Sequence, residues 1–299
     1  MQKYDVVIIG GGPAGLSAAL ILGRSLRKVL VVDNEDYRNK DAHRMHGIIT
    51  RDGAKPGMFL KIAHEELARY DVTFKIAKAS EISIENSEFK IDFVGFKSVM
   101  AKKVLLATGV KDRLPLIPGL KEFYGKSVHH CPYCDGWELK DQPIAVMGNG
   151  KGGIHLALAL RNWSKKVYYC ANGKKLPDEE HTERLLQNGI KIFPEAIAEL
   201  KGKSGKLDKV VFKNGGELTC SGLFFSNGYI PHSYLAEKLG CKMSKQHKIW
   251  VNRKQETSVP GVYAAGDAAL DMTLVIVAAA EGAKAGVAIN TELMKEELK

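Results

Sequence analysis

The residues with the clearest capacity for chemistry lie at positions 129–135, which read HHCPYCD. Cys131 and Cys134 have the spacing of a reversible dithiol, because a C-x-x-C pair can close a disulfide through a short loop. Protonated neighbouring histidines would favour the thiolate, which is the reactive form of cysteine. Asp135 is placed to move a proton to or from a sulfur. We therefore predict a redox-active pair at Cys131 and Cys134.

Three other roles for this cysteine pair are a zinc site, a glutaredoxin-like motif and a pair of inert core cysteines. A zinc site would need two further ligands, and His129 and His130 lie next to Cys131 rather than at ligand spacing, so we predict no metal. A glutaredoxin-like domain uses the same CPYC letters, but there the motif opens the fold, whereas here a glycine loop follows 13 residues later. A pair of inert core cysteines is the remaining alternative. The other three cysteines are expected in the core; they are Cys170, Cys220 and Cys241.

A glycine loop near the N-terminus predicts a dinucleotide site. It follows an apolar strand at 4–9 and matches G-x-G-x-x-G, with glycines for the tight turn, the approach of a pyrophosphate and close packing of the next helix. That helix directs free N–H groups and a positive dipole end at the phosphates. Asp33 ends the next strand, where an acid would bond ribose hydroxyls. The loop residues assigned to the site are Gly10, Gly12, Pro13, Ala14 and Gly15.

A second loop at 148–153, GNGKGG, also matches the pattern. The rest of the fingerprint is missing, because the strand at 167–169 is followed by no Asp or Glu for an NAD ribose. It is also followed by no arginine cluster for the 2′-phosphate of NADP, and only Lys174 and Lys175 come slightly later. A working nicotinamide site and a fold element retained without its ligand both remain open.

The elements around these loops predict the fold class. Each loop lies in a strand–turn–helix–strand unit whose strands are short and apolar, as buried parallel sheets require. Further apolar runs lie at 104–107, 223–225 and 262–265, alternation at 82–93 indicates an antiparallel hairpin, and 274–294 has a helical pattern. We predict an α/β protein with two doubly wound, Rossmann-like dinucleotide-binding domains, the second inserted into the first. The expected boundaries are 1–115 and 250–299 for the first domain and 116–249 for the second.

Composition narrows the classes of partner. The chain has 299 residues and a net charge of +10, but its Lys and Arg residues are scattered without an aromatic-interleaved basic stripe. A solvated basic surface is therefore favoured over a nucleic-acid site. No apolar stretch is long enough to span a membrane. A strand beginning near residue 4 leaves no room for a signal peptide, so we expect a cytoplasmic protein.

Five features in order give the chain a resemblance to the low-molecular-weight thioredoxin reductases over nearly its whole length. They are GGGPAG at 10–15, ATG at 107–109, CPYCDG at 131–136, the glycine loop at 148–153 and VYAAGD at 262–267. The glutathione-reductase branch fits poorly, because its disulfide lies soon after the first glycine loop and this chain has no cysteine before Cys131.

The resemblance implies roles for particular residues. It implies FAD on the first domain, with Asp267, next to Gly266, bonding the ribityl chain, and Thr108 and Gly109 approaching the cofactor. It implies that Cys134 is the sulfur nearest the flavin, Cys131 the interchange thiol and Asp135 the acid/base. It also implies a homodimer and a thioredoxin-like protein or small-molecule dithiol or disulfide as partner.

The chain also departs from that family. The His-Arg-Arg signature after the second unit is replaced by YYCA at 168–171, and the stretch expected near the flavin is the apolar 274–276. The segments YRN at 37–39 and MHG at 45–47, with GWE after the cysteines, are similar to the dithiol oxidases of the gliotoxin and holomycin pathways. Those enzymes close a substrate dithiol and pass electrons to oxygen, although they have His where this chain has Asp135. We place Asn39 and His46 with the cofactor-binding residues.

Three functions remain as alternatives. The first is an FAD-dependent thiol–disulfide oxidoreductase whose NAD(P)H site is weak or absent. The second is a conventional NADPH-dependent thioredoxin reductase in which Lys174 and Lys175 replace the arginines. The third is a non-catalytic flavoprotein that acts as a redox sensor.

Overall fold

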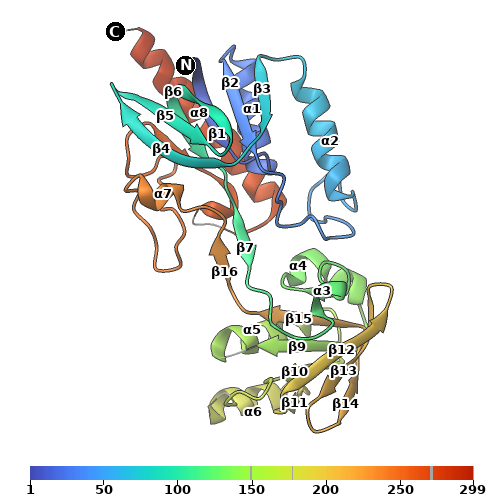
Figure 1. Cartoon of the computed structure of the whole chain (residues 1–299). Coiled ribbons are helices and arrows are strands. Elements are labelled where there is room, and N and C mark those ends of the chain that lie inside the picture. The colour runs from blue at the N-terminus through green and yellow to red at the C-terminus, as the bar shows by residue number, and fades with distance from the viewer. Residues whose placement is uncertain (149, 177, 270–271, 299) are drawn as a thin grey trace. The chain divides into compact units, whose positions relative to one another are not determined.

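The computed structural model describes residues 1–148, 150–176, 178–269 and 272–298 (Figure 1). The chain divides into two compact units. The first unit comprises Met1–Lys40, Gly57–Lys111 and Tyr229–Lys299, and the second comprises Asp41–Pro56 and Asp112–Gly228. Strands β7 (Val110–Asp112) and β16 (Tyr229–Pro231) pair with each other where the chain passes between the units.

A seven-stranded sheet forms the centre of the first unit, in the order β3-β2-β1-β6-β5-β4 with β17 beside β6. Strands β3, β2, β1, β6 and β17 pair in parallel, and β4, β5 and β6 pair antiparallel. The hairpin predicted at 82–93 is confirmed by β4 and β5. The strands are β1 (Gln2–Ile9), β2 (Val29–Asp33), β3 (Val72–Ile76), β4 (Ala79–Glu85), β5 (Glu88–Phe93), β6 (Phe96–Leu106) and β17 (Val262–Ala264). The helices are α1 (Pro13–Arg24), α2 (Pro56–Leu67), α7 (Leu235–Lys238), the 3-10 turn η2 (Gly266–Ala268) and α8 (Val275–Glu297).

Two cores lie on opposite faces of this sheet, because successive side chains of a strand alternate in direction. Val6 and Ile8 of β1 belong to one core with α1 and α8, whereas Val7 and Ile9 belong to the other with the antiparallel strands and α7. Helices α1 and α8 pack very closely. A Cβ on Gly282 would come within 1.9 Å of the backbone oxygen of Ala14.

A parallel five-stranded sheet forms the centre of the second unit, in the order β11-β10-β9-β15-β8, and a separate antiparallel sheet has the order β12-β13-β14. The strands are β8 (Val128–His129), β9 (Ile144–Gly148), β10 (Val167–Cys170), β11 (Lys191–Phe193), β12 (Ile197–Lys203), β13 (Lys206–Phe212), β14 (Glu217–Thr219) and β15 (Gly222–Ser226). The helices are α3 (Leu120–Phe123), α4 (Pro132–Asp135), the 3-10 turn η1 (Trp137–Leu139), α5 (Gly150–Leu160) and α6 (Glu179–Gln187).

The predicted fold class is confirmed, since both units carry the strand–glycine loop–helix–strand arrangement of a Rossmann-like sheet. The helix predicted at 274–294 is α8. The unit boundary, however, lies at Gly228/Tyr229 rather than at 249/250. The reason is that α7 and the loop after it, including Cys241 and Ile249, bury apolar side chains in the core of the first unit. Segment 41–56 groups with the second unit, where His43 N–H bonds the Gly125 oxygen.

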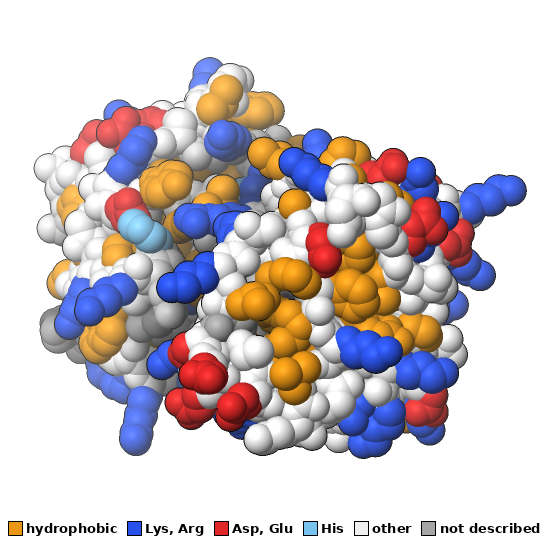
Figure 2. Space-filling view, turned by 90° about the horizontal axis from the view of Figure 1, so that it is seen from below, with side chains coloured by type: hydrophobic (Ala, Val, Ile, Leu, Met, Phe, Trp, Pro, Cys, Tyr) orange, Lys and Arg blue, Asp and Glu red, His pale blue; other side chains and the backbone are white. Residues whose placement is uncertain are grey.

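Charge is distributed in small groups over the visible surface. Figure 2 shows Lys and Arg interspersed with acidic and apolar side chains on that face, without one continuous basic stripe. In the described part of the chain, no helix combines the length and apolar character needed to cross a membrane.

Candidate active site

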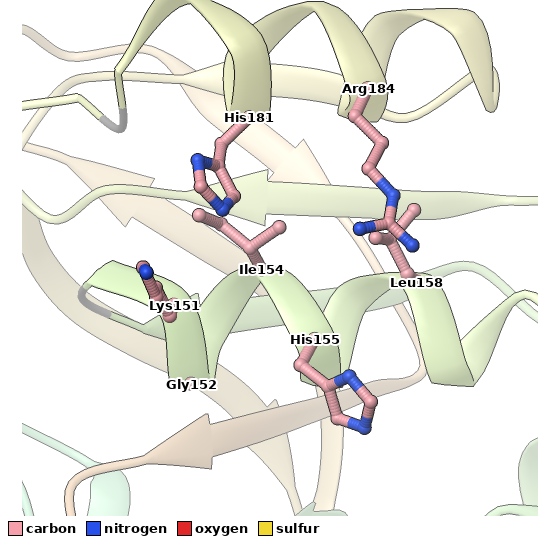
Figure 3. Close-up of a pocket in the computed structure, with 7 residues that line it drawn as sticks. All are labelled: Lys151, Gly152, Ile154, His155, Leu158, His181 and Arg184. Carbon is pink, nitrogen blue, oxygen red and sulfur yellow. The ribbon is translucent and has the colours of Figure 1, made fainter.

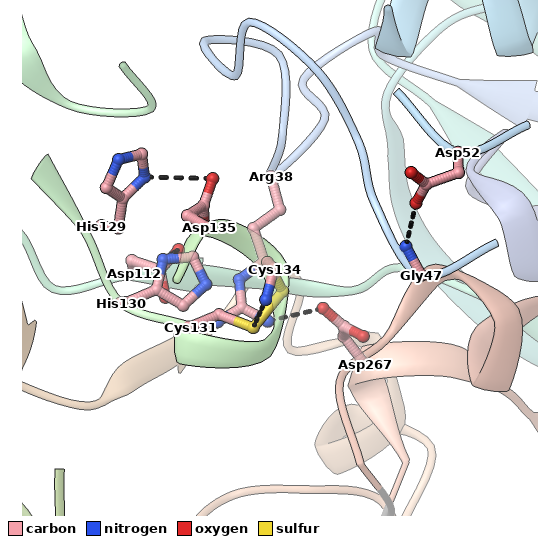
Figure 4. Close-up of a disulfide and its surroundings, with 10 residues drawn as sticks. All are labelled: Arg38, Gly47, Asp52, Asp112, His129, His130, Cys131, Cys134, Asp135 and Asp267. Atoms are coloured by element: carbon pink, nitrogen blue, oxygen red, sulfur yellow. Dashed lines mark hydrogen bonds and ion pairs between the residues drawn. A yellow bond between two sulfur atoms is a disulfide. The ribbon is translucent and has the colours of Figure 1, made fainter. Parts of the chain in front are cut away.

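The predicted cysteine pair forms a disulfide between Cys131 and Cys134 (Figure 4). Cys131 precedes the short helix α4, and Pro132 occupies its first position, where a missing N–H costs nothing. The backbone N–H of Cys134 donates to Sγ of Cys131 at 3.2 Å. Both cysteines are half-buried, so the pair is accessible at the surface of the second unit.

Asp135 is paired with a buried histidine. Nδ1 of His129 lies 3.1 Å from Oδ1 of Asp135, and the His129 side chain is 7% exposed (Figure 4). Strand β8 pairs with β15, which brings the Phe224 ring within 5.4 Å of the His129 ring, centroid to centroid. The imidazole is therefore held between an aromatic ring and a carboxylate.

His130 belongs to a second polar cluster. Its Nδ1 lies 3.7 Å from Oδ2 of Asp112, and the Tyr124 hydroxyl donates to that same oxygen at 2.8 Å. The Asp112 carboxylate is only 5% exposed. Sequence reasoning missed Asp112 and Tyr124, because neither belongs to a motif and only folding brings them beside His130.

The first glycine loop has the tight geometry that its pattern predicts. Gly10 has φ +112°, and a Cβ there would lie 2.2 Å from the Ala107 oxygen. A Cβ on Gly15 would lie 1.9 Å from the Gly10 oxygen. At Gly12, by contrast, an added Cβ meets no described atom within 4 Å. The loop is thus packed underneath and open at Gly12, which fits a pyrophosphate approaching the start of α1.

Asp33 lies beside this loop, at the end of β2. A Cβ on Gly11 would come within 2.6 Å of its carboxylate oxygen, and the Tyr37 hydroxyl donates to Asp33. Burial raises the pKa of Tyr37, and the hydrogen bond to Asp33 raises it further, so the phenol keeps its proton. The carboxylate of Asp33 thus lies beside the glycine loop, and its bond to a ribose hydroxyl stays a prediction.

Asp267 also lies in the first unit, where an ion pair fixes its carboxylate. It lies in η2 and forms an ion pair with Arg38, Nη1 to Oδ2 2.7 Å (Figure 4), with both side chains at most 20% exposed. The neighbouring Gly266 N–H donates to the buried carboxylate of Glu281 at 2.7 Å. The Arg38–Asp267 ion pair was not predicted, because its partners are 229 positions apart in the chain. The Glu281 contact was not predicted, because Glu281 belongs to no motif.

The remaining predicted cofactor residues fall in two groups. Thr108 and Gly109 follow β6 in the first unit, and Asn39 lies in the same unit. His46 lies in the second unit, where its ring nitrogens are 3.3 Å from Asp52 and 3.2 Å from Glu138. The structure thus does not group His46 with the first-unit residues, and its cofactor role stays a prediction.

The second glycine loop connects β9 to α5. Its Asn149, like Pro177 further on, lies outside the described residues. After β10, Asn172 is engaged within the protein: its Oδ1 accepts the Ile197 N–H at 2.8 Å and its Nδ2 lies 3.6 Å from the Met147 sulfur.

A pocket of about 460 Å³ lies between α5 and α6. Figure 3 shows His181 and Arg184 reaching from α6 over Ile154 and Leu158 of α5. The remaining lining residues are Lys151, Gly152 and His155. Cationic side chains over an apolar floor give this pocket the chemistry to hold an anion.

The other cysteines take no part in either site. Cys170, Cys220 and Cys241 are buried free thiols, as predicted. Burial raises the pKa of Cys170 well above its usual range and that of Cys220 to about 12. Among the described residues, no group of three or more His, Cys, Asp or Glu side chains is arranged to hold a metal.

Comparison with known proteins places these features in a family. The model of the pyridine nucleotide-disulphide oxidoreductases matches residues 4–282. A relative named "Probable thioredoxin reductase" from Arthroderma benhamiae is 33% identical over 99% of this chain and 81% of its own length. The thioredoxin reductase of Aquifex aeolicus is 31% identical over 97% and 93%. The crystal structure of HlmI superposes with a TM-score of 0.95 at 33% identity, over 99% of this chain and 94% of that one. The chain therefore belongs to the pyridine nucleotide-disulphide oxidoreductase family, as a thioredoxin-reductase-like disulfide oxidoreductase.

Proposed function

We propose that this enzyme is an FAD-dependent thiol–disulfide oxidoreductase that exchanges electrons with a partner dithiol or disulfide through Cys131 and Cys134. The observation that carries the proposal is the half-buried disulfide with the His129–Asp135 pair directly beside it. When bound, FAD supplies the two-electron chemistry, and the protein supplies position and proton control. The first-unit residues that would hold it are Gly10, Gly12, Pro13, Ala14, Gly15, Asp33, Asn39, Thr108, Gly109, Gly266 and Asp267.

The exchange step uses residues of the second unit. A partner sulfur attacks Cys131, Cys134 leaves as a thiolate, and Asp135 holds or moves the proton. The Cys134 N–H donates to Sγ of Cys131 and helps to fix the sulfur that the partner attacks. Tyr133 lies between the two cysteines in sequence and Trp137 follows them, and these side chains are 75% and 69% exposed. These rings suit contact with a thioredoxin-like protein or with an apolar small-molecule dithiol.

The proposal includes a weak or absent NAD(P)H site. Support comes from the end of β10, where an acid or an arginine cluster would be needed. Asn172 stands there instead, with both ends of its side chain bonded within the unit. The electrons would then pass to or from another carrier, such as oxygen.

A conventional NADPH-dependent thioredoxin reductase is the second candidate. The pocket between α5 and α6 favours it, because Lys151 and Arg184 offer positive charge close to the second glycine loop. These cations could bind a nucleotide phosphate even without the missing arginine cluster.

One anaerobic titration separates the two candidates. We expect a dithiol to bleach the flavin absorbance of the purified yellow protein, and NADPH or NADH to leave it unchanged at micromolar concentration. Rapid bleaching by either nicotinamide would establish the conventional reductase.

A matched variant tests the cysteines and the third possibility, a non-catalytic redox sensor. Cys131→Ser and Cys134→Ser should abolish dithiol turnover, whereas Cys241→Ser, at a buried free thiol, should retain it. If the unmodified protein showed no dithiol turnover, the redox-sensor alternative would be favoured. We further propose a cytoplasmic homodimer, which size-exclusion chromatography with light scattering can check.

A further inference from the structure

The two histidines before Cys131 are placed differently from each other. His129 is buried, with Nδ1 3.1 Å from Asp135, while His130 is 32% exposed and faces Asp112 at 3.7 Å. Asp112 already accepts a hydrogen bond from Tyr124, so the two carboxylates are not equivalent. Of these two carboxylates, Asp135 lies 3.1 Å from its histidine and belongs to α4, the helix that carries Cys134.

From this arrangement we propose that His129 is a positioning residue that forms one proton-holding unit with Asp135 and thereby keeps Cys134 as a thiolate. The proposal rests on the proposed disulfide exchange and adds a proton acceptor to it. Histidine is suited to this role, because its charge changes near neutral pH and a carboxylate can fix the ring by its Nδ1 proton.

The exchange step balances with this assignment. A partner dithiol brings two electrons and two protons. Its first sulfur bonds to Cys131 while the Cys131–Cys134 bond breaks, and that electron pair leaves on Cys134. Its second sulfur then displaces Cys131 and the partner departs as a disulfide. One proton remains on the Cys131 thiol and the other on the His129–Asp135 unit, so Cys134 stays a thiolate.

The elements around the His129–Asp135 pair carry some other titratable side chains. Strand β15, which packs on β8, contributes no titratable side chain. Helix α4 packs against η1, whose Glu138 pairs with His46, and against α5, which carries Lys151 and His155. His130, with Asp112 and Tyr124, precedes the pair in sequence. The experiment must therefore separate His129 from His130, Lys151 and His155.

The test measures the reactivity of the reduced cysteines, with no added electron donor or acceptor present during the measurement. The flavin-loaded protein is reduced, freed of reductant anaerobically and alkylated with iodoacetamide at pH values from about 5 to 9, which span the titration of histidine. Mass spectrometry of the peptides gives a separate rate for each cysteine. The buried Cys170, Cys220 and Cys241 serve as internal references for folding.

The variant His129→Asn keeps a donor at the position of Nδ1 but cannot take up a proton. We expect it to raise the midpoint of the Cys134 alkylation profile by about one pH unit, the size of an ordinary charge effect on a thiol. Asp135→Asn should shift the midpoint comparably, and the double variant should shift it no further, because the two residues act as a unit. His130→Asn, Lys151→Gln and His155→Gln should each shift it less than His129→Asn.

The matched control is His247→Asn, which removes an exposed histidine–carboxylate pair in the first unit, His247 to Glu237 at 3.2 Å. Asparagine also suits the left-handed backbone of that residue, φ +58°. An unchanged profile for His129→Asn, or additive shifts for the two single variants, would overturn the proposal. If His129→Asn does not fold, His129→Gln is measured in its place. Resistance of the disulfide to reduction would instead refute the proposed function.

Discussion

The two glycine loops differ less in their own geometry than in the residues that come after them. Both join a buried parallel strand to a helix, and in both the first and last glycines approach too closely for side chains. After β2, Asp33 turns its carboxylate toward the loop and Tyr37 holds it there. After β10, Asn172 directs its side chain to Ile197 and Met147. The two loops thus share the close approach of their first and last glycines and differ in the side chain at or after the end of the next strand.

The largest expected effect is a loss of bound flavin when the first glycine loop is changed. Gly12→Ala should fold normally, because its φ of −77° suits alanine and no described atom lies within 4 Å of the new methyl group. The methyl group would occupy the space proposed for the pyrophosphate, so we expect the flavin content to fall at least about tenfold, an effect of about 1.4 kcal/mol. Flavin absorbance per protein after purification measures this.

The second loop provides the control for that experiment. A Cβ on Gly150 also meets no described atom within 4 Å. Gly150→Ala should leave the flavin content unchanged, although its φ of +54° makes a small loss of stability expected. Equal flavin loss in both variants would contradict the assignment of FAD to the first loop.

A smaller effect is expected for the residues at or just after the ends of β2 and β10, the strands that come after the two glycine loops. Asp33→Asn should weaken FAD binding by about 10- to 100-fold, since hydrogen bonds to a charged group contribute about 1.5–3 kcal/mol. Asn172→Ala should not change FAD binding but should lower the free energy of unfolding by about 1–2 kcal/mol, because it leaves the Ile197 N–H without its acceptor. Equilibrium dialysis and urea denaturation measure the two quantities. If Asn172→Ala lost FAD while Asp33→Asn retained it, the assignment of FAD to the first unit would be contradicted.

The smallest effect concerns acid sensitivity of the first unit. Burial lowers the pKa of His232, as does nearby Lys111, although Asp36 opposes them at 3.2 Å. A histidine whose pKa is lower in the folded state stabilises the fold fully above its unfolded pKa, and this contribution is lost as the pH falls. His232→Gln should therefore reduce the loss of thermal stability between about pH 7 and 5. A melting temperature with the same pH dependence in both proteins would contradict this assignment.

The central features of the site were predictable because each is encoded locally. A C-x-x-C spacing brings two sulfurs within bonding reach, and glycines between an apolar strand and a helix permit one tight turn. The boundary near residue 249 was not predictable in this way, because the segment 229–249 has no composition that marks its unit. Its assignment depends on Leu235, Ala236 and Ile249, which pack with strands far earlier in the chain.

The sequence by itself determined the α/β class, the Cys131–Cys134 pair and the dinucleotide loop at Gly10, because all three depend on residues close together in the chain. Only the tertiary structure decided the surroundings of those features. It paired His129 with Asp135, His130 with Asp112, and Arg38 with Asp267, and it turned Asn172 inward. Most of these contacts join residues that are distant in sequence, and no local pattern specifies which side chain meets which carboxylate.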